Sequence, residues 1–149
     1  MGTSELVARI EARRALLTGD SVDLRRRAYS ARLFFDHQDD MIKVLNGLGY
    51  TLEQLRALGD QAVVTLVEDV PTLNVEAEMA ARLEAETGNI CPNDVFDMQS
   101  FYTAIPYSTY IVAEKASVSR ARQAKLDVRY QVSLSQSLTS LLDLSLIHI

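Results

Sequence analysis

Cysteine and long apolar runs are both scarce in this chain of 149 residues. The only cysteine is Cys91, which excludes an internal disulfide framework and a zinc site built from cysteines. No run of about 18 apolar residues occurs, so no segment is predicted to cross a membrane. No charged-then-apolar leader indicates secretion. We therefore expect a cytoplasmic protein without a membrane partner.

Positive charge is also in deficit, with 15 Lys and Arg against 20 Asp and Glu and a net charge of −5. This balance argues against a protein that wraps nucleic acid by bulk electrostatics, although a nuclease can combine an acidic site with a local basic rim. The hydrophobic content of 48% suffices for a packed core, and the length favours one domain.

Candidate chemistry concentrates between Pro92 and Lys115. Asn93 follows a proline and is a good helix N-cap, and two carboxylates, Asp94 and Asp97, fall in the first turn, where the helix dipole favours negative charge. Because these acids are three residues apart, they share a helix face with roughly 5–6 Å between their Cβ atoms. Pro106 is expected to end the helix.

A short β-branched and aromatic run over residues 109–112 then predicts a buried strand, and Glu114 lies just past its end. In open α/β sheets, functional groups collect beyond the carboxyl ends of strands, so Glu114 is expected near Asp94 and Asp97. Three converging carboxylates would form a hard-cation site for Mg²⁺ or Mn²⁺.

The spaced motifs of this region resemble the C-terminal half of PIN-like domains, especially an uncharacterised bacterial branch that reads N-D-x-x-D, A-x-P-Y and V-T-E-K. The motifs here are Asn93-Asp94-x-x-Asp97, Ala104-Ile105-Pro106-Tyr107 and Ile111-Val112-Ala113-Glu114-Lys115, followed by Leu126-Asp127 and Tyr130. The resemblance covers roughly residues 66–142. It implies a compact α/β fold, of a class in which many members are metal-dependent ribonucleases with clustered acids.

By this resemblance Asp97 matches the acid that opens the late helix, Glu114 the acid after the following strand, and Asp94 an accessory acid. The three would be catalytic and hold Mg²⁺ or Mn²⁺, and RNA would be the substrate. Two features depart from the family pattern. Ala113 stands where the family usually has threonine, and residues 1–17 predict a helix where the family has an opening strand that ends in Asp.

The two ends of the chain carry a further expectation. Residues 144–149 read as a common transposon-end sequencing adapter translated in one frame, so we expect a non-native tail and exclude His148 from the site. A wrongly assigned first methionine would explain the missing strand. We therefore expect a partial PIN-like domain over 1–143, with a helical part over 1–88 and the acidic-site helix and sheet over 89–143.

Helical periodicity predicts the remaining elements. Helices are expected over residues 3–17, from Ser21 or Asp23 to 35, over 41–48, from a Thr51–Gln54 capping box onward, and over 75–87, 117–126 and 135–142, with a second strand over 128–134. The second of these helices is expected to face the core through Leu24, Ala28, Ala31 and Phe35. Its arginines are interpreted either as a solvated face or as an RNA-contacting patch, and Cys91 as a small buried hydrophobe.

The expected architecture is thus α/β and predominantly helical, with a small parallel sheet, PIN-like and incomplete. Two functions remain open. One is a divalent-metal-dependent ribonuclease that uses Asp94, Asp97 and Glu114. The other is a non-catalytic helical interaction or structural protein, a homodimer or bound to a partner protein, in which the two aspartates are N-terminal helix charges and Glu114 is a surface acid.

Overall fold

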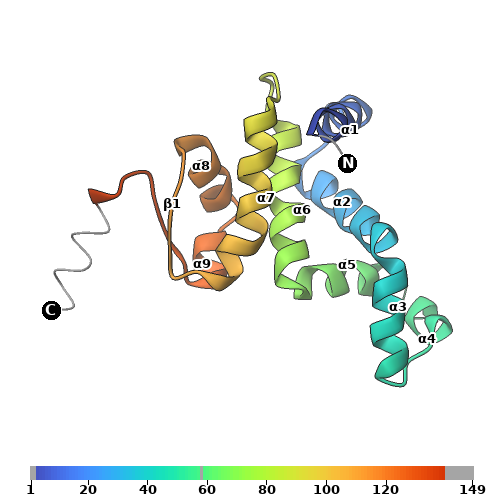
Figure 1. Cartoon of the computed structure of the whole chain (residues 1–149). Coiled ribbons are helices and arrows are strands. Elements are labelled where there is room, and N and C mark those ends of the chain that lie inside the picture. The colour runs from blue at the N-terminus through green and yellow to red at the C-terminus, as the bar shows by residue number, and fades with distance from the viewer. Residues whose placement is uncertain (1–2, 58, 140–149) are drawn as a thin grey trace, which may run out of the picture.

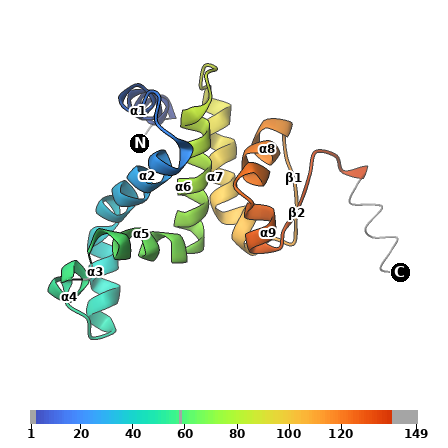
Figure 2. The same cartoon turned by 180° about the vertical axis from the view of Figure 1, so that it is seen from behind.

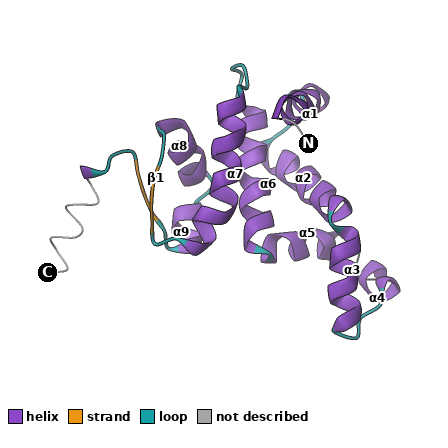
Figure 3. Cartoon of the chain, viewed as in Figure 1, coloured by secondary structure: helices purple, strands orange, loops and turns teal. Residues whose placement is uncertain are grey.

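The computed structural model describes residues 3–57 and 59–139, so the expected tail over 144–149 lies outside the described residues. The described chain is mostly helical with a two-stranded parallel sheet, which confirms the predominantly helical α/β architecture (Figures 1 and 3). The elements are α1 (Thr3–Leu16), α2 (Val22–Asp36), α3 (Gln38–Gly47), α4 (Leu52–Ala57), α5 (Asp60–Asp69), α6 (Pro71–Ala85), α7 (Pro92–Tyr107), β1 (Tyr110–Val112), α8 (Lys115–Gln123), α9 (Leu126–Tyr130) and β2 (Ser133–Ser135).

The core forms around α6, which packs against α1, α2, α5, α7 and α8. Figures 1 and 2 show α6 and α7 side by side at the centre of the molecule. On α6 the buried residues Val75, Met79 and Leu83 recur every four positions, and on α7 Phe101 and Ile105 do the same. This spacing places each set on one helix face, and the two faces meet in the core.

The two strands pair in parallel, with Tyr110 opposite Ser133 and Val112 opposite Ser135. The connection between them runs through α8 and α9, as parallel strands require. Ile111 packs against the core, whereas Val112 is partly exposed because successive side chains point to opposite faces. The expectation of a buried first strand is therefore wrong, because Tyr110 and Ile111 are half-buried and Val112 is exposed.

The core face of α2 also differs from the prediction. Leu24 and Phe35 are exposed, whereas Tyr29, Leu33 and Phe34 are buried. The start of the helix was predicted correctly, because the Ser21 side chain accepts a hydrogen bond from the Leu24 N–H at 3.2 Å. The helical periodicity of the sequence predicted burial of the stripe that contains Leu24 and Phe35. In the structure, packing against α6 buries the stripe that contains Tyr29 and Leu33 instead.

Prolines belong to two helices that extend beyond their predicted limits. Pro71 is the first residue of α6, a position where the missing N–H costs nothing. Pro106 lies in the last turn of α7, and the Ser108 N–H still donates to the Ala104 carbonyl at 2.9 Å beyond it. Similarly, Cys91 rather than Asn93 is the N-cap of α7, with Pro92 as its first residue.

The segment after Thr51 forms two helices rather than one. The predicted capping box is confirmed, with the Thr51 N–H donating to Gln54 Oε1 at 2.8 Å and the Gln54 N–H donating to Thr51 Oγ1 at 3.2 Å. Gly59, at φ 80° and ψ 177°, then separates α4 from α5. A residue with these angles cannot continue a helix.

The helix and the strand predicted to follow β1 are both present, but their residue ranges differ from the prediction. α8 begins two residues earlier than predicted, and residues 128–130 belong to α9 rather than to a strand. Ser135 lies in β2, and residues 140–142 of the expected last helix fall outside the described residues. Among residues 3–57 and 59–139, no helix combines the length and apolar character that crossing a bilayer requires.

Candidate functional site

Asp94, the first predicted site residue, lies at the N-terminus of α7. Its Oδ2 accepts hydrogen bonds from the Cys91 N–H and the Cys91 thiol, both at 3.0 Å. Its Oδ1 accepts a hydrogen bond from Arg120 Nη2 at 3.1 Å. Burial alone would raise the pKa of Asp94, but the bonds from Cys91 and Arg120 hold this pKa below its ordinary value. Asp94 is therefore an ionised helix cap.

Arg120 on α8 joins two acidic side chains. It donates to both carboxylate oxygens of Glu86, at 2.7 and 2.8 Å, and to Asp94. Only 6% of the Arg120 side chain is exposed, so this bidentate pair is shielded from water on the arginine side. The guanidinium thus supplies to Asp94 the positive charge that a metal ion would otherwise provide.

Asp97 and Glu114 lie at two other helix positions. Asp97 is one turn after Asp94, and its Oδ2 accepts a hydrogen bond from Ser117 Oγ at 3.3 Å. Glu114 is exposed and is the N-cap residue of α8, where its backbone carbonyl accepts from the Val118 N–H at 3.0 Å. The position of Glu114 favours a carboxylate through the positive end of the α8 dipole, whereas Asp97 lies beyond the first turn of α7.

Within the part of the chain that the structure describes, no three His, Cys, Asp or Glu side chains lie together as a group able to hold a metal ion. Asp94, Asp97 and Glu114 come from the two adjoining helix starts, but Asp94 is already bound to Arg120. This arrangement does not fit a three-carboxylate cation site as it stands. The site stays a prediction that rests on the sequence motifs.

Two features of this region were missed or misread from the sequence. Arg120 is not among the residues that the motifs predict for the site, yet it is buried and binds Glu86 and Asp94. The spacing of residues along the chain carries no signal for this contact. Cys91 is exposed rather than buried, because it occupies the N-cap of α7.

A second candidate surface lies on α3, at the far end of the molecule from α8 and α9. Figures 1 and 2 show α3 and α4 projecting away from α6 and α7. The apolar residues Met41, Val44, Leu45 and Leu48 recur at the i, i+3, i+4 and i+7 positions of one helix face. None of the ten residues of α3 is buried, and Val44 and Leu48 are 64% and 69% exposed.

The space beside this stripe, between α3, α5 and the start of α6, is called here the acidic groove. It consists of two hollows of about 740 and 400 Å³ that share Leu45 and Leu66. The charged residue of the larger hollow is Asp69, whereas the smaller hollow contains His37 and Asp40, and Asp40 is paired with Lys43 at 3.0 Å. The groove is therefore apolar inside, with the negative charge of Asp69 at its edge.

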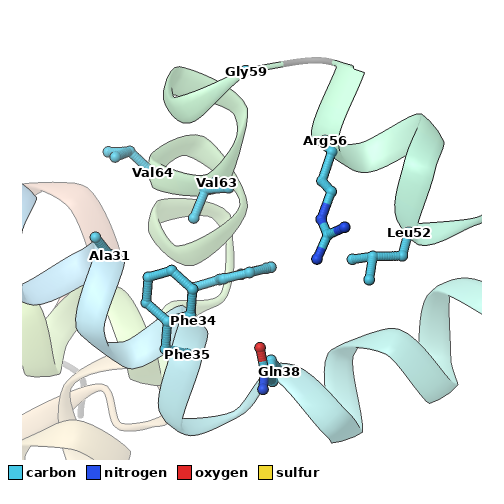
Figure 4. A pocket seen from close by; sticks show the side chains of 9 residues that line it. All are labelled: Ala31, Phe34, Phe35, Gln38, Leu52, Arg56, Gly59, Val63 and Val64. Atoms are coloured by element: carbon cyan, nitrogen blue, oxygen red, sulfur yellow. The ribbon is translucent and has the colours of Figure 1, made fainter.

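The basic face, as we name the surface between α2, α4 and α5, has a different charge. It comprises Leu24, Ala28 and Phe35 of α2, with a hollow of about 370 Å³ next to Phe35. The charged residue that lines this hollow is Arg56, and Figure 4 shows Arg56 reaching into it from α4. Arg27, one turn before Ala31, is exposed at the edge of the α2 stripe.

Comparison with known proteins adds no assignment. No protein-family model, no curated protein and no solved structure matches the chain. The chemistry of its own side chains is therefore the evidence on its function, and membership of the PIN-like domains stays a prediction.

Proposed function

We propose that this chain is a non-catalytic helical interaction protein whose binding surface runs along α2 to α5. The observation that supports this proposal best is α3, an amphipathic helix with none of its ten residues buried. A helix of this length is marginal in water by itself. Covering its apolar stripe would stabilise it by about 25 cal/mol for each Å² removed from water.

The acidic residues near α7 and α8 have the roles that this proposal expects of them. Asp94 caps α7 and binds Arg120, Asp97 accepts a hydrogen bond from Ser117, and Glu114 lies at the N-terminus of α8. Each carboxylate contributes to helix ends and to helix packing without a metal ion. No catalytic step is needed to account for them.

A metal-dependent ribonuclease is the competing proposal, and the order of the PIN-like motifs favours it. In that case Asp94, Asp97 and Glu114 would hold Mg²⁺ or Mn²⁺, and the ion would supply a site that orients water at a phosphate of RNA. Arg120 would have to release Asp94 before that carboxylate could serve as a ligand. This requirement separates the two proposals experimentally.

Manganese titration by calorimetry tests the choice between them. We expect no saturable heat from the chain with Mn²⁺ up to about 1 mM, the weak end of protein sites for hard cations. The matched variants are Asp97→Asn and Asp23→Asn, the latter on α2 away from α7. A binding heat that Asp97→Asn removes and Asp23→Asn retains would overturn the non-catalytic proposal and justify an RNA cleavage assay.

A further inference from the structure

The two apolar surfaces of α2 to α5 carry opposite charges. The acidic groove has Asp69 at its larger hollow, and the Asp40 of its smaller hollow is paired with Lys43, whereas the hollow of the basic face has Arg56. Arg27 adds a second exposed arginine beside the α2 stripe. An occupant that fits the acidic groove must therefore present apolar side chains flanked by positive charge.

The exposed side of α2 has this chemistry. Leu24, Ala28, Ala31 and Phe35 form an apolar stripe with helical spacing, and Arg27 lies next to it. Phe35 is 63% exposed, so the stripe is available to a neighbour. A helix that lays an apolar stripe into a groove between two helices is a common mode of recognition.

The lengths of the two partners also agree. Leu24 and Phe35 are separated by 11 positions, which corresponds to roughly 16 Å along a helix. The ten residues of α3, which form one wall of the acidic groove, span roughly 15 Å. The apolar stripe of α2 therefore extends along the whole of the wall that it would cover.

We propose that the occupant of the acidic groove is α2 of a second copy of this chain. In a two-fold dimer the contact occurs twice, because α2 of each protomer enters the groove of its partner. The opposite charges of the two surfaces, both carried by one chain, favour a second copy over an unrelated protein. This inference rests on the proposed interaction function and identifies its partner.

Sedimentation equilibrium over a range of chain concentrations tests the proposal, with Arg27→Glu and Asp69→Arg as the informative variants. Both residues are exposed, so the fold is expected to tolerate the changes, and circular dichroism checks this. We expect a reversible dimer for the unchanged chain. We expect each variant alone to have a dissociation constant raised by about tenfold or more, because like charges then face each other twice.

An equimolar mixture of the two variants provides the decisive measurement. In a mixed dimer, one contact joins the two substituted side chains and the other joins the two original ones, so both contacts pair opposite charges. Dimer formation should therefore return. Val128→Ser on α9, which removes an exposed apolar side chain elsewhere, should leave the dimer unchanged.

Three results would overturn the second-copy proposal: a monomer at all concentrations, a dimer indifferent to both charge reversals, or a mixture that stays monomeric. Manganese calorimetry on the same sample is independent of these results. A monomer that binds no Mn²⁺ rejects the dimer and leaves the non-catalytic proposal standing, whereas Mn²⁺ binding lost in Asp97→Asn rejects the non-catalytic proposal itself.

Discussion

Buried ionisable side chains connect α1, α2 and α6 at the scale of single residues. Arg13 Nε donates to Glu84 Oε1 at 2.6 Å, and the Arg13 guanidinium lies 4.6 Å from the centre of the Tyr29 ring. Tyr29 Oη in turn donates to Glu76 Oε1 at 3.2 Å. Burial raises the pKa of Glu84 and of Glu76, and their hydrogen bonds and neighbouring positive charges only partly offset it.

Replacing Glu76 by glutamine tests the energetic consequence of this burial. Because the folded-state pKa of Glu76 is raised, folding takes up a proton, so its stabilising contribution is complete below the unfolded-state pKa. That contribution is lost as the pH rises through the folded-state pKa. Glutamine keeps an acceptor for Tyr29 without the buried charge, so Glu76→Gln should gain stability relative to the unchanged chain as the pH rises from about 4 to 7.

Thermal unfolding at several pH values measures this difference. Glu53→Gln on the exposed side of α4 is the matched control and should show little change in melting temperature with pH relative to the unchanged chain. A Glu76→Gln melting-temperature difference that stays constant over this pH range would contradict the assigned role of burial.

At the scale of elements, the break between α4 and α5 depends on the backbone of Gly59. Its φ of 80° and ψ of 177° lie in a region that is essentially restricted to glycine. A Cβ placed at Gly59 would meet nothing within 4 Å, so crowding is not the obstacle. The cost of a substitution here is therefore one of backbone conformation.

Gly59→Ala should lower the free energy of unfolding by about 1–3 kcal/mol, whereas Gly47→Ala should raise it by up to about 1 kcal/mol. Gly47 lies within α3 and also has open space around its Cβ position, so it is the matched control. Urea denaturation of both variants measures the two changes. Equal effects from the two substitutions would exclude a special role for the Gly59 backbone.

The sequence determined the type of most elements better than their limits and faces. The Ser21 and Thr51 caps were predicted correctly because capping uses side chains within three residues of each other. The buried face of α2 was not, because Leu24 and Phe35 form as regular a stripe as Tyr29 and Leu33 do. Contact with α5 and α6 decides which stripe is buried.

At the scale of the whole molecule, α3 and α4 project away from α6 and α7 (Figures 1 and 2), so the proposed dimer predicts a stability that depends on association. If a second copy covers α3, the melting temperature should rise by a few degrees, about 2–5 °C, when the chain concentration increases about 100-fold. High salt should reduce this rise because it screens the charges of the two surfaces. Differential scanning calorimetry measures both dependences, and Arg27→Glu should have a lower melting temperature than the unchanged chain at each concentration at which the unchanged chain is dimeric.

The candidate metal site was only partly predictable. The sequence placed Asp94 and Asp97 in the first turn of one helix, and both lie on α7, but only Asp94 is in its first turn because the helix begins at Pro92. It did not indicate that Arg120, 26 residues after Asp94, binds that carboxylate. Such a pairing depends on how α8 packs beside α7, and the spacing of residues along the chain carries no record of it.

The sequence by itself determined the predominance of helix and the caps at Ser21 and Thr51, since these depend on side chains close together in the chain. Tertiary structure alone decided which apolar stripe of α2 enters the core and which partner neutralises Asp94. It also left Val44 of α3 exposed, while Met41 of the same helix packs against the core. Either face of a helix could pack against the neighbouring helices. Which face is buried therefore depends on the positions of all the helices.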